Sequence, residues 1–366
     1  MNDLPVASRQ LPAATRVVVA MSGGVDSSVA AALLKEQGYD VVGIMLKLWS
    51  DGESGRANRC CTPADVDAAR SIANQLAIPF YLINIADSFK ATVVDYFIDE
   101  YASGRTPNPC LICNRQIRYE LLLNKALSLG VQYLATGHYA RVRQTAEGEY
   151  QLLRGVDAQK DQSYVLSVLG QKELSHALWP LGELTKPQAR ELAQNYKLSV
   201  AEKVESQDLC FLANGDYRDF LTRHAPVGSI RPGEIRDTAG KVLGKHQGLP
   251  FYTIGQRKGL GLTASEPRYV IALDVADNTV IVGAQHELGR HECAAREMHY
   301  VSGNPPIEPF RASAKIRYKA REVAVTMRPQ GTRAQIEFDE LQRDITPGQG
   351  LVLFDADRVI GQGFIE

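Results

Sequence analysis

The feature that most constrains the fold is the stretch Val17–Ser28, where an apolar β-branched run is followed by a Ser-Gly-Gly turn and then by helix-forming residues. This pattern predicts a strand that leads through a tight loop into the N-terminus of a helix. The two glycines allow backbone N–H groups to converge next to the positive end of the helix dipole. Three serines add hydroxyl donors: Ser22, Ser27 and Ser28. The stretch therefore predicts an anion site, the alternative being an ordinary capped turn.

The loop differs from the phosphate-binding loop of P-loop nucleotide-binding proteins, because no Gly-Lys-Ser/Thr follows its glycines. It also contains Asp26. A carboxylate inside an anion site is unfavourable unless it acts through a cation such as Mg²⁺ or caps the helix. Asp26 is therefore expected to do one of these two things.

Strands and helices alternate after the loop. An apolar run over 41–46 predicts a second strand, Pro63 opens a predicted helix over 64–76, and 79–84 predicts a third strand. Alternation of this kind predicts an α/β fold with a doubly wound, mostly parallel sheet, in which ligands bind at the carboxyl ends of strands. Further helices are predicted over 89–102, 173–177 and 186–196.

The segment 130–141 predicts another strand, and this strand ends in a glycine turn at Gly137. It should bring Gly137 and His138 to the same sheet edge as the first loop. A lone histidine is often structural, so structural and ligand-contacting roles for His138 are both open. Arg154 and Lys160 lie in polar surroundings, where a solvated turn explains the charges equally well.

Beyond Phe220 glycine and proline become frequent, and short apolar runs predict strands in hairpins. Strands are expected over 269–273, 278–282, 311–319, 334–338 and 351–354. We predict an N-terminal catalytic domain over 1–212, a small central β-rich domain over 213–285 and a C-terminal β-barrel domain over 286–366. The central part contains a basic, glycine-rich loop, 246–261, suited to phosphate contact. Residues 1–15 read as a loose tail.

The net charge of −1 shows no overall attraction to a polyanion, so a nucleic-acid surface would have to come from local basic patches. There is no secretory leader pattern and no apolar run long enough to span a membrane. We expect a cytoplasmic protein, a monomer without membrane contact. In a reducing compartment its six cysteines are thiols, metal ligands or catalytic groups more often than disulfides.

A Cys-x-x-Cys pair, Cys110 and Cys113, follows two prolines near the start of a predicted helix. The helix dipole and the neighbouring Arg115 should lower the pKa of a thiol there and favour the nucleophilic thiolate. Two structural cysteines are the alternative. Cys210, taken by itself, is predicted to be a small buried apolar residue. Cys60 and Cys61 are adjacent to each other, and neighbouring cysteines seldom chelate one metal, so they are predicted to be loop residues.

Six segments together resemble one family. They are the Ser-Gly-Gly-Val-Asp-Ser loop, Leu46–Trp49, Gly104–Asn114 with its Cys-x-x-Cys pair, Ala135–Arg141, Lys160–Tyr164 and Gly255–Gly259. The loop alone resembles that of the PP-loop ATP pyrophosphatases, which cleave ATP between the α- and β-phosphates. The whole set, from about residue 16 to the end, resembles the tRNA-specific 2-thiouridylases.

This resemblance implies that ATP adenylates the C2 oxygen of the wobble uridine (U34) of certain tRNAs, after which sulfur displaces AMP. It implies Cys113 as nucleophile and Cys210 as the persulfide intermediate, with a sulfur-donor protein as partner. The ATP residues it implies are Ala20, Met21, Ser22, Gly23, Gly24, Val25, Asp26, Ser27, Leu46 and Gly137. Contacts with tRNA are implied for Asn108, Pro109, Cys110, His138, Lys160, Asp161, Gln162, Arg317, Tyr318 and Gln349.

Two positions depart from some members of the family. Some have Met in place of Leu46, a swap of similar volume. Some have Asp in place of Cys110, so an acid–base role for that position does not carry over. Three thiolates, from Cys110, Cys113 and Cys210, also leave open an iron–sulfur cluster with an open iron site.

Two other functions remain open at this point. One is a PP-loop ligase or amidotransferase that adenylates a small molecule. The cysteines and the basic C-terminal loops argue against it. The other is a tRNA-binding protein without catalysis. The intact Ser-Gly-Gly-Val-Asp-Ser loop argues against it.

Overall fold

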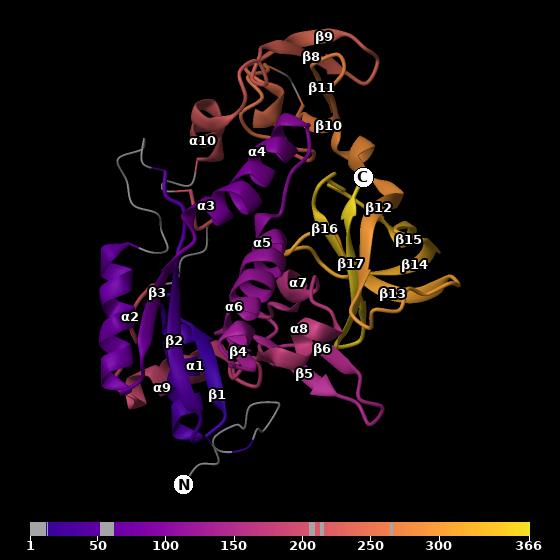
Figure 1. Ribbon diagram of the computed structural model, residues 1–366. Helices are drawn as coiled ribbons and strands as arrows, with labels where there is room; N and C mark the ends of the chain where they lie inside the picture. Colours follow the sequence, from indigo (N-terminus) through magenta and orange to yellow (C-terminus); the bar gives the residue numbers. More distant parts are fainter. Residues whose placement is uncertain (1–11, 13, 52–61, 205–208, 213–215, 264–265) are drawn as a thin grey trace.

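The computed structural model describes residues 12, 14–51, 62–204, 209–212, 216–263 and 266–366. Its N-terminal part is a five-stranded sheet with the order β3-β2-β1-β4-β7 (Figure 1). Every pairing in this sheet is parallel. The strands are β1 (Arg16–Ala20), β2 (Asp40–Lys47), β3 (Phe80–Asn84), β4 (Tyr133–Ala135) and β7 (Ala177–Leu178). The predicted doubly wound α/β fold is confirmed, and the strand order reverses between β1 and β4.

Helices cover both faces of the sheet. One face packs against α1 (Val25–Glu36), α2 (Pro63–Gln75) and α9 (Lys186–Asn195). The other packs against a long composite helix of α5 (Pro109–Ile112), the π-helical segment η3 (Cys113–Leu122) and α6 (Leu123–Ser128), together with α7 (Ser163–Leu166) and α8 (Gln171–His176). Proline at the first position and a Thr62 capping box begin α2 where the sequence predicted. No helix in the described ranges is long and apolar enough to cross a membrane.

A second composite helix, made of α3 (Ala86–Phe89), the π-helical η2 (Lys90–Val94) and α4 (Asp95–Ala102), lies between the parallel sheet and the central domain (Figure 1). The prediction of a helix over 89–102 was correct except for its first turn. After it, Gly104 adopts a left-handed backbone with φ +69°, which a glycine tolerates without strain. This turn leads into the segment that carries Cys110 and Cys113.

The central sheet has the order β10-β11-β8-β9. Its strands are β8 (Gly233–Asp237), β9 (Val242–His246), β10 (Tyr269–Asp274) and β11 (Thr279–Gly283). A helix, α10 (Tyr217–His224), precedes it, and short 3₁₀ turns follow at η4 (Leu249–Phe251) and η5 (Gln285–Leu288). The predicted central β-rich part is confirmed.

The C-terminal strands run in the order β12-β15-β14-β13-β16-β17, and β12 also pairs with β17. This additional pairing closes six antiparallel strands into the predicted barrel. The strands are β12 (Arg290–Tyr300), β13 (Phe310–Lys315), β14 (Val323–Gln330), β15 (Arg333–Gln342), β16 (Gly350–Asp355) and β17 (Arg358–Ile365). The strand expected over 311–319 ends at Lys315, because the chain turns there and the Ala320 N–H bonds the Arg317 carbonyl.

A hairpin that the sequence did not predict joins the barrel to the N-terminal part. Its strands, β5 (Ala140–Gln144) and β6 (Tyr150–Arg154), leave the carboxyl edge of the parallel sheet just after His138. They extend the barrel sheet through β17, with Leu153 opposite Arg358. The barrel is therefore anchored directly to the segment that follows one of the expected ligand-binding turns.

An aromatic cluster holds the short segment 209–212 in place. Phe211 is fully buried, and its ring makes edge or tilted contacts with Phe89, Phe97 and Phe220. These partners come from the composite helix over 86–102 and from α10. Cys210 is thus attached to the core through the residue that follows it.

Replacing Phe211 with alanine should lower the free energy of unfolding by about 3–5 kcal/mol, the usual cost of emptying an aromatic core site. Urea unfolding of the full chain measures this change. Phe211→Leu, which keeps most of the volume, serves as the matched control and should cost clearly less. An alanine variant as stable as the parent would contradict the anchoring role.

Candidate active site

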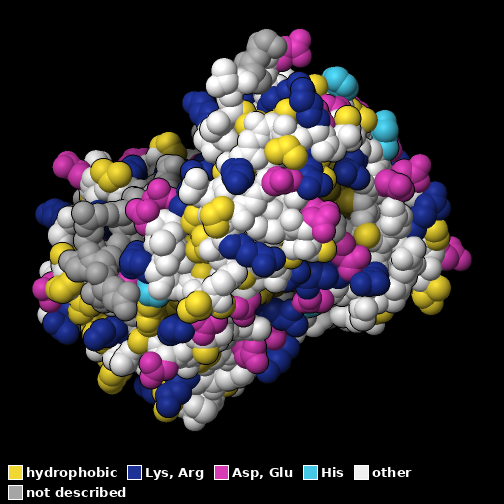
Figure 2. All heavy atoms as spheres, turned by 90° about the horizontal axis from the view of Figure 1, so that it is seen from above, with side chains coloured by type: hydrophobic (Ala, Val, Ile, Leu, Met, Phe, Trp, Pro, Cys, Tyr) yellow, Lys and Arg dark blue, Asp and Glu magenta, His cyan; other side chains and the backbone are white. Residues whose placement is uncertain are grey.

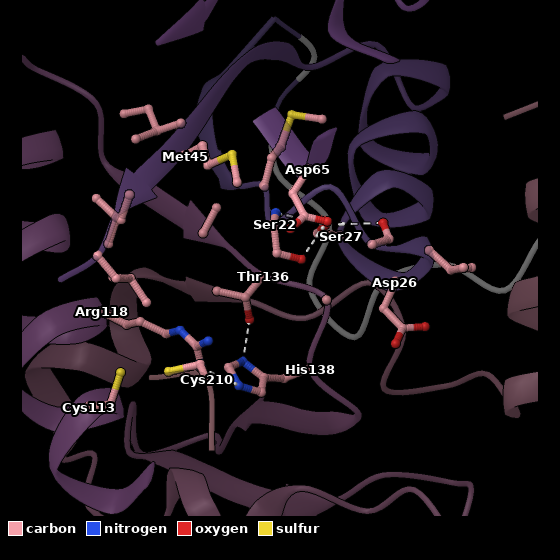
Figure 3. Close-up of a pocket in the computed structure, with 18 of the residues that line it drawn as sticks. Ser22, Asp26, Ser27, Met45, Asp65, Cys113, Arg118, Thr136, His138 and Cys210 are labelled. Carbon is pink, nitrogen blue, oxygen red and sulfur yellow. Dashed lines mark hydrogen bonds between the residues drawn. The ribbon is translucent and has the colours of Figure 1, made fainter. Parts of the chain in front are cut away.

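A cavity of about 390 Å³ opens at the point where the strand order reverses, between the carboxyl ends of β1 and β4 (Figure 3). Thirteen of the residues singled out from the sequence line it: Ala20, Met21, Ser22, Gly24, Val25, Asp26, Ser27, Leu46, Cys113, Gly137, His138, Gln162 and Cys210. The first loop, the Cys-x-x-Cys helix, the glycine turn after β4 and the segment of Cys210 therefore meet at one site.

The Ser-Gly-Gly loop has the expected strand-to-helix geometry. Gly23 adopts φ +69°, and a Cβ there would lie 2.4 Å from the carbonyl oxygen of Asp65, so glycine is required. Inside the loop the Ser22 N–H donates to Ser27 Oγ at 3.1 Å. The hydroxyl of Ser28 is an exception to the prediction, because it is buried and donates back to the Gly24 carbonyl at 2.7 Å.

Two lysines from distant parts of the chain hold the acidic side chains of the cavity. Lys186 Nζ lies 2.7 Å from Asp26 Oδ1, which also accepts a hydrogen bond from the Tyr139 hydroxyl at 2.8 Å. Lys203 Nζ lies 2.5 Å from Asp65 Oδ1 and donates to the Gly23 carbonyl at 2.8 Å. Asp26 is thus ion-paired and makes no side-chain cap on α1.

Burial opposes the ionisation of Asp65, but hydrogen bonds from Lys203 and Thr62 outweigh it and hold the pKa of that carboxyl below its usual range. The end of the cavity at the Ser-Gly-Gly loop therefore contains two ion pairs, each joining one carboxylate to one ammonium group.

His138 lies on the other side of the cavity, between Arg118 and Thr136 (Figure 3). Arg118 can only donate, so its contact at 3.1 Å makes His138 Nε2 an acceptor. The ring proton is then on Nδ1, which donates to Thr136 Oγ1 at 2.6 Å. Burial and the positive charge of Arg118 hold the pKa of His138 well below its usual value, in agreement with a neutral ring.

The cysteines of the site differ in exposure. Cys110 is exposed, whereas Cys113 and Cys210 are half-buried and both line the cavity, and all three are thiols. The predicted low pKa of a thiol at this helix start is wrong for Cys113. Burial raises the pKa of its thiol, and the charge that partly offsets the rise comes from Arg118, while Arg115 is exposed.

The structure places the remaining predicted tRNA residues outside the cavity. They are Asn108, Pro109, Cys110, Lys160, Asp161, Arg317, Tyr318 and Gln349. Asp161 is buried, and its carboxylate accepts hydrogen bonds from the Gly155 and Ser163 N–H groups. Gln349 donates to the Thr106 and Pro107 carbonyls, so it fixes the chain just before Asn108.

The barrel turn at Arg317 and Tyr318 contacts the N-terminal part of the chain at Asp161 and Tyr164. The Tyr318 hydroxyl donates to the Asp161 carbonyl at 3.4 Å, and the Tyr318 ring contacts Tyr164. Arg317 is exposed and pairs with Asp344. Cys60 and Cys61, expected to be loop residues, and most of the tail over 1–15 lie outside the described residues.

Comparisons with known proteins agree along the chain. Family models described as a tRNA methyl transferase HUP domain, a tRNA methyl transferase PRC-barrel domain and an aminomethyltransferase β-barrel domain match residues 15–214, 218–284 and 290–365. The tRNA-specific 2-thiouridylase MnmA of Moorella thermoacetica is 52% identical over 357 residues, which cover 95% of this chain and 99% of that protein. The protein of the same name from Symbiobacterium thermophilum is 48% identical over 97% of this chain and 93% of its own.

The chain belongs to the tRNA-specific 2-thiouridylase family.

Several residues of this 2-thiouridylase site were not found by sequence reasoning. The polar ones are Asp65, Arg118, Thr136, Lys186 and Lys203. Arg118 and Thr136 are next to motifs that were noticed, so a helical spacing from Cys113 or a position before Gly137 could have indicated them. Lys186 and Lys203 lie 160 or more positions from their loop partners in sequence and carried no local signal.

Gly137→Ala should weaken ATP binding. The new Cβ would lie 2.7 Å from backbone atoms of Asp26 and Ser27, so the loop must shift. Overpacking of this kind costs about 1–3 kcal/mol, and about 1.4 kcal/mol corresponds to a tenfold change in the dissociation constant. We expect roughly tenfold weaker binding in calorimetric titration with ATP. Gly170→Ala, where a Cβ would make only ordinary contacts from 3.4 Å outward and which lies outside the cavity lining, should bind ATP as the parent does.

Stability should fall as the pH falls below about 6.5, the usual pKa of histidine in an unfolded chain. His138 is held neutral in the folded protein, so the unfolded state binds more protons in this range. Urea unfolding at pH 7.5 and 5.5 tests this for the parent and for His138→Gln. The variant should lose less stability between the two conditions, and an equal loss in both proteins would rule out the buried neutral ring as a contributor.

Proposed function

We propose that this protein is a tRNA-uridine 2-sulfurtransferase, which uses ATP to convert the C2 oxygen of the wobble uridine U34 into sulfur and releases AMP and pyrophosphate. One observation carries this proposal: the Ser-Gly-Gly loop and the thiols of Cys113 and Cys210 line the same cavity. An ATP-activating site without sulfur chemistry needs no cysteine pair, and a tRNA-binding protein needs neither.

ATP is proposed to bind over the carboxyl ends of β1 and β4. Ser22, Gly23 and Gly24 would cradle a phosphate at the start of α1, and the apolar residues Met21, Val25 and Leu46 would contact the nucleoside. Gly137 would allow close approach of the nucleotide, because its backbone already packs against the loop. Lys186 and Lys203 add positive charge next to the place where pyrophosphate leaves.

Mg²⁺ fits the same end of the cavity by its donor set. Carboxylate oxygens are the ligands it prefers, and Asp26 and Asp65 both line the cavity together with two serine hydroxyls. When bound with ATP, the ion would neutralise charge on the leaving pyrophosphate. Asp26 would then exchange part of its pairing with Lys186 for the metal, which leaves the ammonium group available to a phosphate oxygen.

Sulfur transfer is proposed in two steps. A donor protein first leaves a persulfide, Cys210–S–SH; after loss of its proton, the terminal sulfur attacks C2 of the adenylated uridine, the C2–O bond breaks and AMP leaves. The Cys113 thiolate then attacks the Cys210 sulfur and breaks the S–S bond. The sulfur stays on the base as the thiocarbonyl, and a Cys113–Cys210 disulfide forms, which a cellular thiol reductant must cleave before the next cycle.

The tRNA would reach the cavity from the side of the segment 108–110 and the barrel turn at Arg317 and Tyr318. His138 and Gln162 line the cavity and would contact the target nucleotide directly, while Lys160 lies on the adjoining loop. Asp161 and Gln349 would act by holding these segments. Figure 2 shows basic and acidic side chains mixed over the upper face, so binding would depend on local basic patches such as exposed Arg257 and Lys258.

We also propose the domain division at 1–212, 213–285 and 286–366, which the three matched ranges support. An iron–sulfur cluster fits the described residues poorly, since they contain no group of three His, Cys, Asp or Glu side chains arranged to hold a metal. Iron and sulfide counting after anaerobic purification decides the matter, and an active, iron-free preparation that depends on a persulfide donor would exclude a cluster requirement.

Cys113→Ser and Cys210→Ser should each abolish formation of 2-thiouridine in a purified assay with tRNA, ATP, Mg²⁺ and a persulfide donor. Adenylation does not need either thiol, so both variants should still release pyrophosphate in the presence of tRNA, whereas AMP should leave only with Cys113→Ser, in which the Cys210 persulfide can still displace it. In a single turnover without a thiol reductant, Cys113→Ser should leave the uridine attached to Cys210 as a mixed disulfide, which added reductant would release as 2-thiouridine.

Cys293→Ala is the matched control for these variants, because Cys293 lies in the barrel core, away from the cavity. It should retain full thiolation. Full activity of either serine variant would refute the assigned roles. ATP–pyrophosphate exchange without tRNA would instead favour a small-molecule ligase.

A further inference from the structure

Arg118 occupies a position between the two catalytic cysteines and the base-facing histidine. It lies on the π-helical segment η3, five residues after Cys113. In a π-helix the backbone bonds join residues five apart, so Cys113 and Arg118 stand on successive turns of one side. Figure 3 shows its guanidinium pointing toward Cys210 and His138, within the cavity.

Its neighbours are neutral or sulfur groups. Arg118 Nη1 donates to Asn114 Oδ1 at 2.8 Å and to His138 Nε2 at 3.1 Å. No carboxylate in the described ranges forms an ion pair with it, in contrast to Lys186 and Lys203 in the same cavity. Arg118 is half-buried, and a cation that is partly removed from water is costly unless an anion balances it.

The sulfur atoms are the groups that act on its charge. Burial alone would lower the pKa of Arg118, yet Cys113, Cys210 and Cys110, in this order, outweigh burial and raise it. Conversely, the positive charge of Arg118 acts to lower the pKa of Cys113 and partly offsets the rise that burial causes. A permanent cation is therefore coupled to the site of both sulfur intermediates.

We propose that Arg118 stabilises anionic sulfur in this cavity, first the persulfide of Cys210 and then the thiolate of Cys113. This inference rests on the proposed sulfur transfer and makes Arg118 a positioning residue that acts through the two cysteines. Its N–H bond to His138 at the same time fixes the ring with its proton on Nδ1.

A phosphate of the adenylate is the other anion that Arg118 could meet. The lysines argue against this assignment, because Lys186 and Lys203 already stand at the loop where the phosphates are expected. Arg118 instead contacts groups on the η3 side and the turn after β4, where the thiols lie.

The test measures the reactivity of Cys113 in the enzyme without ATP or tRNA. Alkylation by iodoacetamide, resolved by peptide mass spectrometry, is followed from pH 6 to 10 for the parent, Arg118→Met, Arg118→Gln and Arg118→Lys. Loss of the charge should move the pH profile of Cys113 upward and slow its alkylation at neutral pH roughly tenfold, which is the effect of one pKa unit. The lysine variant should recover most of the rate.

Arg115→Met is the matched control. Arg115 is exposed and lies three residues before Arg118 on the same helix, so loss of its charge should leave the pH profile of Cys113 alkylation unchanged. The glutamine variant retains a donor for Asn114 and covers a failure of the methionine variant to fold. Thiolation by the neutral variants should fall at pH 7.5 and recover in part at pH 9.5, which a merely structural defect would not do.

Unchanged alkylation in both neutral variants would overturn the proposal, and weaker ATP binding with unchanged alkylation would assign Arg118 to a phosphate. Because alkylation needs no tRNA, a failure of the proposed function would leave the shifted profile intact. The two proposals can thus fail separately.

Discussion

The parallel pairing of β1 with β2 on one side and with β4 on the other is the constraint on which the site depends. The chain after β1 enters α1 on one face of the sheet, whereas the chain after β4 enters the β5–β6 hairpin, so the two turns diverge and leave a crevice. Val17, Val18 and Val19 are buried and hold β1 in the centre. The Ser-Gly-Gly turn and the Thr136-Gly137-His138 turn therefore face each other whatever the distant domains do.

Charged side chains are distributed unevenly across this crevice. At the loop, Lys186 is ion-paired with Asp26 and Lys203 with Asp65. These four side chains could exchange partners when the proposed nucleotide binds. Near the thiols, Arg118 has only neutral or sulfur neighbours in the described residues. In the proposed mechanism, separate cations within one cavity thus face the phosphates and the sulfur atoms.

Local patterns were sufficient to predict most of the elements, because each was encoded by neighbours in sequence. The strand–loop–helix over 17–36 and the Pro63 helix start are of this kind. The hairpin β5–β6 was missed because its short strands are stabilised by β17, about 200 residues away. Lys186 and Lys203 were missed because their partners are also distant in sequence. For Cys113 the sequence predicted a lowered pKa, whereas burial raises it. Burial depends on the tertiary structure and does not follow from a position near the start of a helix.

In the proposed second step the Cys113 thiol must lose its proton, because burial raises its pKa. His138 is an unsuitable acceptor, since both of its ring nitrogens already form hydrogen bonds. His138 Nδ1 carries a proton, and Nε2 accepts from Arg118, so the ring offers no open acceptor while that contact holds. Tyr119 is buried with its pKa raised to about 12 and cannot act as a base either. Neither of these two described groups can therefore take the proton of Cys113 in the proposed second step, whereas solvent or a phosphate oxygen of AMP could do so. In the proposed mechanism, the raised pKa of Cys113 keeps most of its thiol protonated near neutral pH, and a protonated thiol attacks the Cys210 persulfide slowly.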